Sequence, residues 1–374
     1  MNNFFFPESF SYLSIQYFFL IGIGLILYYL LPQFTRIKAL RAIDERSSTI
    51  QWVILLIVSM IFYWYVIGKD SSVFLFFLGT VLFSYLAGLI ISRTRDSVFS
   101  FRAFVGLETL ALVPLVLIKI SAFIEPIINH DMENIGNIIA PIGLSFYTLQ
   151  IYAYLYDVHK GKIDAELNPL KYLLFISFFP HIVQGPIARF GDLRRELFKH
   201  HEYDEEGIAK GFQLIVWGFF MKYMIADRAG VFVDEVFEKN RMYLGVFVLI
   251  AGILYSIQLY TDFLSCVCIS RGVAESFGIR ISDNFARPYL STSIKDFWRR
   301  WHISLSSWLR DYVYIPLGGN RKGKLRKNLN LMLTFLVSGF WHGNGYNFLF
   351  WGGLHGVYQF GGGIAETKLR KLKT

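Results

Sequence analysis

Histidine is the residue type in this sequence best suited to acid–base chemistry, and four of its eight copies lie in or beside apolar sequence. Those four are His181, His302, His342 and His355. An ionisable side chain at membrane depth is costly to bury, so its presence there is a functional hypothesis by default. The remaining histidines lie in polar loops, where we expect them to be solvated.

His342 lies in the segment Ser338–Gly343, at the end of an apolar run, and is a candidate general base. The glycines of this segment permit close backbone approach. Phe340 and Trp341 provide an apolar wall that shields the imidazole from water, which suits it to abstract a proton from a hydroxyl group. The alternative is a structural histidine that caps the end of a helix.

The other three histidines have weaker local signals. His302 ends the segment Trp298–His302 and could orient a substrate or relay a proton. Its alternative, which the residues alone slightly favour, is an interfacial histidine hydrogen-bonded to the backbone. His355 fits a packed core position better than a site. His181 could likewise be a core histidine or a site residue.

No metal site is predicted, and no bound cofactor. Cys266 and Cys268 are the two cysteines of the sequence, and a disulfide between positions i and i+2 would be strained. The sequence has no P-loop, no Gly-x-Ser-x-Gly elbow and no His-Glu-x-x-His pattern. Asp262 is the acid inside the apolar run 243–268, and we expect it to pair with an arginine or to orient a histidine.

The elements that position these residues are predicted to be transmembrane helices. Hydrophobic residues make up 54% of the 374 residues and charged residues 17%, with a mean hydropathy of +0.42. Apolar runs of about 20 residues match a hydrocarbon core of about 30 Å. Nine spans are predicted, at 11–31, 51–68, 72–92, 102–124, 137–157, 211–227, 243–268, 329–343 and 346–364. We therefore expect an all-α, polytopic helical bundle that forms one membrane-embedded domain over 1–374.

A further apolar stretch, 170–188, is predicted not to cross the membrane. Pro180, Gly185 and Pro186 interrupt it, and such a helix cannot keep its backbone hydrogen bonds in lipid. We expect a re-entrant or broken segment that is buried within protein.

The net charge of +9 comes from basic residues between the apolar runs, which indicates membrane orientation rather than nucleic-acid binding. Their distribution predicts the N-terminus outside and the C-terminus in the cytoplasm. The first charged residue is Glu8, and the first apolar run is too long for the core of a signal peptide, so no cleavable signal peptide is expected.

The longest polar stretch, 269–328, is predicted to face the cytoplasm and holds twelve basic and four acidic residues, a net charge of +8. Its apolar residues recur at helical spacing, at Phe297, Trp301, Leu305, Trp308, Tyr312 and Ile315. Ser293 with Asp296 resembles a capping box at the start of this helix, and a glycine-rich turn at 316–320 ends it. We expect an amphipathic helix at the membrane surface or against the bundle.

Several motifs together resemble the membrane-bound O-acyltransferase (MBOAT) family. They are Pro141–Tyr147, Phe178–His181 with Gly185–Ile187, Asp296–His302, Ser306–Tyr312, Ile315–Asn320 and Phe340–Gly343. The sequence looks most like the branch that contains the alginate O-acetylation membrane subunit, and more distantly like the D-alanyl transfer protein of teichoic acid modification. The matching region runs roughly from 140 to 356, and its motifs are long and in order.

This resemblance implies a multi-helix bundle in the bacterial inner membrane with a funnel open to the outside. It implies that His342 is catalytic and that His302 is a second catalytic-site residue. The substrate-binding residues expected from the motifs are Trp298, Arg299, Arg310, Asp311, Trp341 and His181. Two features differ from the alginate-like branch: Cys268 stands where its members often have aspartate, and the chain ends 32 residues after His342, where members usually continue.

The expected reaction moves an acyl group, acetyl first among the candidates, from a cytoplasmic thioester to a hydroxyl of an extracellular polysaccharide or an intermediary protein. The donor is acetyl-CoA or an acyl carrier protein, and the basic 269–328 stretch would attract either. A membrane-anchored or extracellular partner that receives or delivers the acyl group is expected, as is contact with membrane lipid. The alternatives are D-alanyl transfer to teichoic acid, a transporter, and a non-catalytic scaffold of a surface-polymer assembly.

Overall fold

The computed structural model describes residues 15–35, 43–124, 141–239, 241–343 and 345–373. These residues form helices joined by turns, and none of them lies in a β-strand. The all-α prediction is therefore confirmed for the described chain. The helices group into two compact units, one made of 1–74 with 168–282 and the other of 75–167 with 283–374. This grouping does not test the prediction of one membrane-embedded domain.

Five helices in the described ranges are long and apolar enough to cross a membrane, which supports a multi-pass membrane protein. Their candidate spans are Ile15–Gln33, Ser48–Val66, Ser71–Thr94, Ser100–Ser121 and Val246–Ser276. The other four predicted spans also contain helices, at 144–159, 205–226, 323–342 and 346–373. Residues 11–14 and 137–140 of the predicted spans lie outside the described residues. The count of nine thus stays a prediction, whereas each predicted span contains a helix in its described part.

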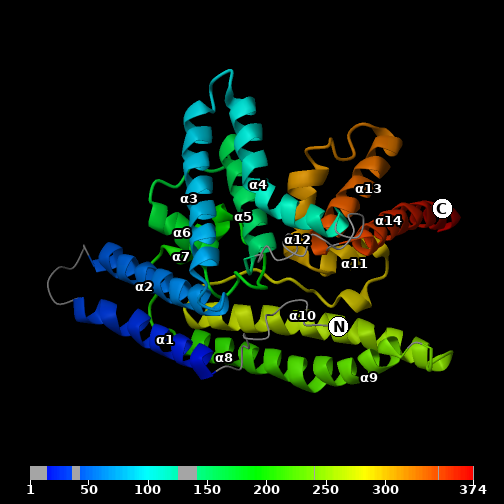
Figure 1. Ribbon diagram of the computed structural model, residues 1–374, viewed down its shortest axis with the longest axis horizontal. Helices are drawn as coiled ribbons and strands as arrows, with labels where there is room; N and C mark the ends of the chain where they lie inside the picture. Colours follow the sequence, from blue (N-terminus) through cyan, green and yellow to red (C-terminus); the bar gives the residue numbers. More distant parts are fainter. Residues whose placement is uncertain (1–14, 36–42, 125–140, 240, 344, 374) are drawn as a thin grey trace. The chain divides into compact units, whose positions relative to one another are not determined.

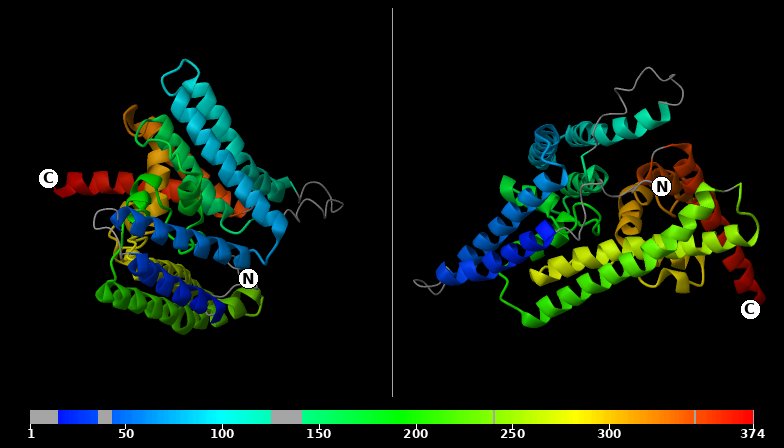
Figure 2. Two further views of the ribbon diagram at one scale, coloured as in Figure 1. Left: turned by 90° about the vertical axis from the view of Figure 1, so that its left-hand side faces the viewer. Right: turned by 60° about the horizontal axis from the view of Figure 1, so that its bottom comes forward.

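Unit 1 consists of two long helical pairs and a short broken segment. Its elements are α1 (Ile15–Thr35), α2 (Ile43–Val66), α6 (Pro169–Ser177), α7 (Phe190–Leu197), α8 (Glu205–Phe220), the π-helical turn η1 (Met221–Ala226), α9 (Asp227–Glu238) and α10 (Val246–Ser276). α8, η1 and α9 continue one another as a single rod that runs along α10 (Figures 1 and 2). α8 approaches α10 closely at Gly211, which has no side chain. A Cβ at this position would overlap the backbone carbonyl of Gly272.

The predicted broken segment is broken in the structure. α6 has 9 residues and ends at Ser177, so at about 1.5 Å per residue it is far too short to cross a core of about 30 Å. Beyond it the Phe179 N–H donates to Ser59 Oγ at 3.2 Å, and Ser270 Oγ donates to the Pro180 carbonyl. Backbone groups that a helix would have paired are thus partly satisfied by neighbouring protein, as irregular structure at membrane depth requires.

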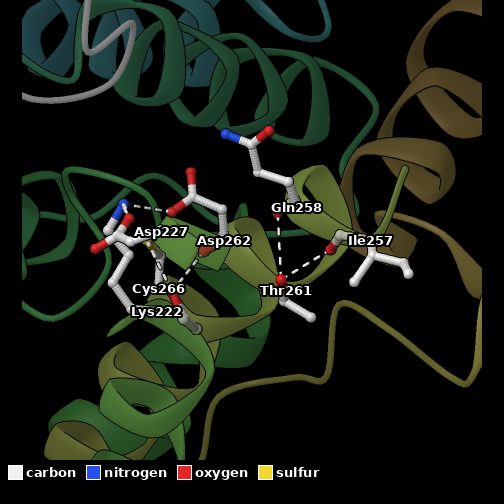
Figure 3. Close-up of polar contacts among 8 residues, drawn as sticks. Lys222, Asp227, Ile257, Gln258, Thr261, Asp262 and Cys266 are labelled. Carbon is white, nitrogen blue, oxygen red and sulfur yellow. Dashed lines mark hydrogen bonds and ion pairs between the residues drawn. The ribbon is translucent and has the colours of Figure 1, made fainter. Parts of the chain in front are cut away.

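An ion cluster lies where η1 meets α10. The Lys222 ammonium is 2.7 Å from Asp262 Oδ1 and 2.9 Å from Asp227 Oδ1 (Figure 3). The expectation that Asp262 pairs with an arginine or orients a histidine was therefore wrong: its partner is a lysine from the adjacent helix. Position 222 could not be matched to 262 from the sequence, because the pairing depends on how the two helices align.

Unit 2 holds the remaining helices. They are α3 (Ser71–Thr94, which begins in unit 1), α4 (Ser100–Ile124), α5 (Leu144–His159), the 3₁₀ turn η2 (Pro288–Leu290), α11 (Ile294–Arg300), α12 (Ile303–Leu309), the π-helical turn η3 (Arg310–Tyr314), α13 (Gly323–His342) and α14 (Tyr346–Lys373). α13 and α14 pack closely because Gly339 and Gly352 have no side chain: a Cβ at Gly339 would overlap the Phe348 carbonyl. This approach sets α14 directly beside the C-terminal turn of α13.

The predicted amphipathic helix starts as expected but does not continue as one helix. Ser293 caps α11, because its hydroxyl accepts a hydrogen bond from the Asp296 N–H at 3.1 Å. The chain then leaves helical geometry at Trp301 and His302 and starts again as α12. The prediction of an unbroken helix was wrong because a periodic apolar stripe cannot reveal a single left-handed residue inside it. The glycine-rich turn after η3 is confirmed and is held by Asn330, whose side chain donates to the carbonyls of Leu317 and Gly319.

Candidate active site

His302 occupies the break between α11 and α12 with a left-handed backbone, φ +43°. Asn284 fixes the backbone that follows His302. The Ile303 N–H donates to the Asn284 backbone carbonyl and the Ser304 N–H to the Asn284 side-chain oxygen, both at 2.9 Å. The Ala286 N–H donates to the Arg300 carbonyl across the same break. A non-glycine residue in this conformation persists only where its surroundings enforce it, and such residues cluster at active sites. The break therefore fixes the position of one imidazole.

His342 ends α13, and its ring orientation is set by the helix itself. Its Nδ1 is 2.7 Å from the Ser338 carbonyl oxygen, one turn earlier, and 3.3 Å from Ser338 Oγ. A carbonyl can only accept, so this contact assigns the proton of the neutral ring to Nδ1. The opposite nitrogen, Nε2, is then an acceptor with a lone pair, which is the state that a general base needs.

The two imidazoles face one another inside unit 2. Their ring centroids are 6.5 Å apart, with the planes perpendicular. Burial, with His342 nearby, holds the pKa of His302 well below its ordinary value, so this imidazole is neutral at pH 7. Trp341 and Trp351 lie against His342, each with a centroid distance of 4.9 Å. The result is a pair of histidines with aromatic rings packed against His342.

Trp341 connects this pair to the start of α5. Its indole N–H donates to the Ser145 carbonyl at 3.0 Å, and its ring packs on Phe146 at 5.4 Å. Farther along α5, the Leu149 carbonyl accepts a hydrogen bond from the Trp308 indole, and Asp157 accepts one from the Tyr312 hydroxyl. The motifs around positions 145, 308 and 341 thus form one packed support for the two histidines.

A cavity of about 520 Å³ in unit 2 extends to Ser338, one helical turn before His342. It is lined by residues of α11 to α14, among them Trp298, Thr334 and Ser338, and by four basic side chains, Lys295, Arg299, Arg310 and Lys327. Ser338 connects the cavity to the site, because its carbonyl and hydroxyl both contact His342 Nδ1. A basic, partly apolar cavity of this volume can hold a flexible anionic ligand with its reactive end near an imidazole.

Trp298 presents an open hydrogen-bond donor in this cavity. Its Nε1 is buried and has no hydrogen-bond partner in the described ranges of the chain. Its ring is fixed by Phe335, Trp351 and His355, at centroid distances of 5.1, 6.0 and 5.0 Å. A buried indole N–H normally finds a partner, so a rigid ring with an unsatisfied N–H suits a ligand acceptor.

The structure brings together most of the residues that the sequence predicted for the site. His302, His342 and Trp341 form the imidazole pair and its wall, while Trp298, Arg299 and Arg310 line the cavity. Asp311 forms an ion pair with Arg310, at 2.7 Å from Nε. These positions agree with the predicted roles, which themselves stay predictions.

His181 lies in unit 1 and is not part of this group of unit 2 side chains. It is 2% exposed, and its ring packs on Phe178 at 5.3 Å. Its backbone carbonyl accepts the Gly185 N–H at 3.0 Å, which closes the turn of the broken segment. Its predicted role in substrate binding stays a prediction.

Two further ionisable residues of unit 2 were not predicted for the site. His355 packs on Trp351 at 4.6 Å, as His342 does at 4.9 Å, although its sequence context favoured an ordinary core position. Lys119, inside a predicted span, is buried on α4. The sequence signal for Lys119 was its charge inside a predicted span, which by itself marks a functional candidate. Among the described residues, no three His, Cys, Asp or Glu side chains gather as a metal site would require.

Unit 2 thus holds two histidines with ring centroids 6.5 Å apart, and Ser338 joins one of them to a basic cavity. The sequence model of the membrane-bound O-acyltransferase family matches residues 10–372, and the chain belongs to that family. The resemblance inferred from the motifs is thereby confirmed over nearly the whole chain.

Curated relatives include members of both expected branches and a peptidoglycan O-acetyltransferase. A probable alginate O-acetylase of Pseudomonas putida is 35% identical over 318 residues, covering 82% of this chain and 64% of the relative. A peptidoglycan O-acetyltransferase of Helicobacter pylori is 35% identical, covering 75% of this chain and 58% of the relative. A teichoic acid D-alanyltransferase of Bacillus subtilis is 30% identical, covering 68% and 66%. The chain thus spans about three fifths of the O-acetylating relatives.

Proposed function

We propose that the protein is an O-acyltransferase that moves an acyl group, most simply acetyl, from a cytoplasmic thioester to a hydroxyl group outside the membrane. The observation that carries the proposal is the link between the basic cavity and His342: Ser338 lines the cavity and fixes the ring of His342 through Nδ1. Family membership and the O-acetylating relatives support the same reaction.

The ring orientation of His342 supports a general-base mechanism. Nε2 accepts the proton of the acceptor hydroxyl while the hydroxyl oxygen attacks the carbonyl carbon of the thioester. Collapse of the tetrahedral intermediate breaks the C–S bond and forms the ester, and the proton passes from Nε2 to the departing thiolate. His302, neutral and fixed at 6.5 Å between ring centroids, positions a reactant by hydrogen bonding.

The cavity favours an anionic donor with a long, flexible arm. Lys295, Arg299, Arg310 and Lys327 supply positive charge that suits the phosphates of acetyl-CoA or the acidic surface of a carrier protein. With this side in the cytoplasm, the N-terminus is outside and the C-terminus inside, as positive-inside counting predicts. A surface polysaccharide, or a membrane-anchored or extracellular partner protein, takes the acyl group.

D-alanyl transfer to teichoic acid is the second candidate, because a D-alanyltransferase is among the relatives, although at 30% identity. The two reactions share the thioester donor and the hydroxyl acceptor, so the same site serves either. The acid released from the product ester, acetate or D-alanine, distinguishes them.

The proposal is tested by measuring ester-linked acyl groups on the cell-surface polysaccharide. A strain that lacks the gene is complemented with the natural protein, His342→Ala or the matched control His159→Gln, which changes a histidine at the end of α5. We expect esters to return with the natural protein and the control, and to stay absent with His342→Ala at equal membrane levels. Equal restoration by His342→Ala would instead favour a scaffold or transporter.

A further inference from the structure

Residues 284–286 are hydrogen-bonded to both sides of the break between α11 and α12. The backbone carbonyl of Asn284, a residue with 0% exposure, accepts the Ile303 N–H at 2.9 Å. Two residues further on, the Ala286 N–H donates at 2.9 Å to the carbonyl of Arg300, the last residue of α11. We call this segment the 284–286 clasp, because it holds the end of one helix and the start of the next.

The Asn284 side chain adds a third hydrogen bond to the clasp. Its Oδ1 accepts the Ser304 N–H at 2.9 Å. An amide N–H can only donate, so this contact assigns the oxygen of the carboxamide to the side of α12. The opposite atom, Nδ2, is buried and has no hydrogen-bond partner among the described residues. The side chain therefore holds the break through one acceptor oxygen.

His302 depends on such support because its backbone is left-handed, with φ +43°. A bulky residue avoids this region and keeps it only where the surroundings over-determine the conformation. The two peptide groups that follow His302 both donate to Asn284, one to its backbone and one to its side chain. Without the side-chain bond, the backbone of His302 can relax, and its ring then leaves the position 6.5 Å from the His342 centroid.

We propose that Asn284 is a positioning residue that acts on acyl transfer through His302. This inference rests on the function proposed above, in which His302 positions a reactant. The clasp anchors His302 from outside α11, the helix whose Trp298 and Arg299 line the cavity. Loss of the Asn284 oxygen should therefore slow the catalytic step, since small displacements of a reacting group are costly, and leave donor binding largely intact.

A purely structural role is the competing interpretation, because a lost hydrogen bond to a buried N–H also lowers stability. The two interpretations differ in what happens once the imidazole is absent. A residue that acts through His302 then has little left to contribute to kcat. A structural residue lowers activity by the same factor with or without the imidazole, because independent effects add in free energy.

The test is a double-mutant cycle in the full chain. Asn284→Ala and Asn284→Asp are each made in the natural protein and in a His302→Asn background, where asparagine tolerates the left-handed backbone and keeps the break. Membrane vesicles from the deletion strain, which keep their own acceptors and partners, report kcat and KM for acetyl transfer from acetyl-CoA. Thermal melting by size exclusion gives the folded amount of each variant, so that kcat is expressed per folded molecule.

We expect Asn284→Ala to lower kcat by about 10- to 30-fold, because the imidazole loses its orientation. KM for acetyl-CoA should change less than about threefold, since the side chains that line the cavity are unchanged. Asn284→Asp keeps an acceptor oxygen for the Ser304 N–H and should retain at least about a third of the natural kcat. In the His302→Asn background, Asn284→Ala should lower kcat less than about twofold.

Asn168→Ala provides the matched control. Asn168 belongs to unit 1, and its side-chain oxygen also accepts a backbone N–H, that of Leu170 at 2.9 Å, as the N-cap of α6. The change removes the same kind of hydrogen bond from a residue of the same type. It should lower the melting temperature and leave kcat per folded molecule unchanged.

Three outcomes would overturn the inference while the natural protein is active. The first is an equal factor of change in kcat from Asn284→Ala in the two backgrounds, and the second is a change in KM alone. The third is a folded Asn284→Asp no more active than Asn284→Ala, since the acceptor oxygen would then not matter. A folded natural protein that transfers no acetyl group would overturn the proposed function itself, and the role of Asn284 with it.

Discussion

Lys222 and Lys119 lie in helices of different units, and their surroundings differ. Lys222 of unit 1 is held between Asp262 at 2.7 Å and Asp227 at 2.9 Å. Lys119 of unit 2 is 7% exposed and forms no ion pair in the part of the chain that the structure describes. Carboxylates that neutralise a charge make it part of the fold, whereas a buried charge without such a partner is costly and marks a functional candidate. Whether a buried charge has a partner therefore says more about its role than the charge alone does.

The same contrast separates two tryptophans of unit 2. The Trp308 indole N–H is bonded to the Leu149 carbonyl at 2.9 Å and holds α12 against α5. The Trp298 N–H is buried in the cavity without a protein acceptor among the described residues. We therefore expect changes to Trp308 to alter stability, and changes to Trp298 to alter donor binding.

After His342→Ala, the largest expected effect is that of His302→Asn. Asparagine tolerates the left-handed backbone at this position, so the break between α11 and α12 is kept while the imidazole is removed. Loss of one positioning group should lower kcat by up to about 10²-fold with little change in melting temperature. Stopped-assay kinetics in vesicles and thermal melting measure the two quantities. A fall in stability with kcat per folded protein preserved would place His302 among the structural histidines.

Asp262→Asn should be the largest change to stability in unit 1. Removing one carboxylate leaves Lys222 with Asp227 alone, at a cost of about 2 kcal/mol for this partly exposed cluster. Melting temperature should fall, while kcat per folded molecule stays unchanged. The double variant Lys222→Met with Asp262→Leu removes both charges of the pair and should recover most of the loss. A large drop in kcat for either variant at full folding would contradict the comparison.

Trp298→Phe should give a smaller, kinetic effect. It removes the open N–H but keeps an aromatic ring, so KM for the donor should rise by about fivefold, equivalent to about 1 kcal/mol for one hydrogen bond. The matched change Trp308→Phe removes a bonded N–H and should lower the melting temperature without raising KM. Donor titrations of the two variants side by side distinguish these results, and equal KM values would mean that the Trp298 N–H binds no donor group.

The smallest effect is expected at the basic residues of the cavity. Lys327 is exposed, and Lys327→Gln should raise donor KM only about twofold at low salt, with the difference vanishing near 0.5 M salt because screening weakens exposed charges. KM measured across a salt series checks this. A salt-independent change would indicate a direct contact rather than a long-range attraction.

Local sequence patterns predicted much of the fold. Apolar runs gave the helices, the two prolines and the glycine of 170–188 gave the broken segment, and Ser293 gave the start of α11. These features depend on neighbours within one or two turns, which the sequence shows directly. The candidate site was predicted in part for the same reason: His302, His342 and the adjoining tryptophans lie in long family motifs, and the structure assembles them.

The sequence by itself thus determined the helical membrane class, the family and the histidines that could act as bases. Tertiary structure alone decided that His302 interrupts a helix, that Asp262 pairs with Lys222, and that His342 and His355 pack on the same ring, Trp351. The physical reason is one of range. Hydrophobic periodicity and turn chemistry act between residues close in the chain, whereas a contact between helices depends on their register and close approach, which packing of the whole unit determines.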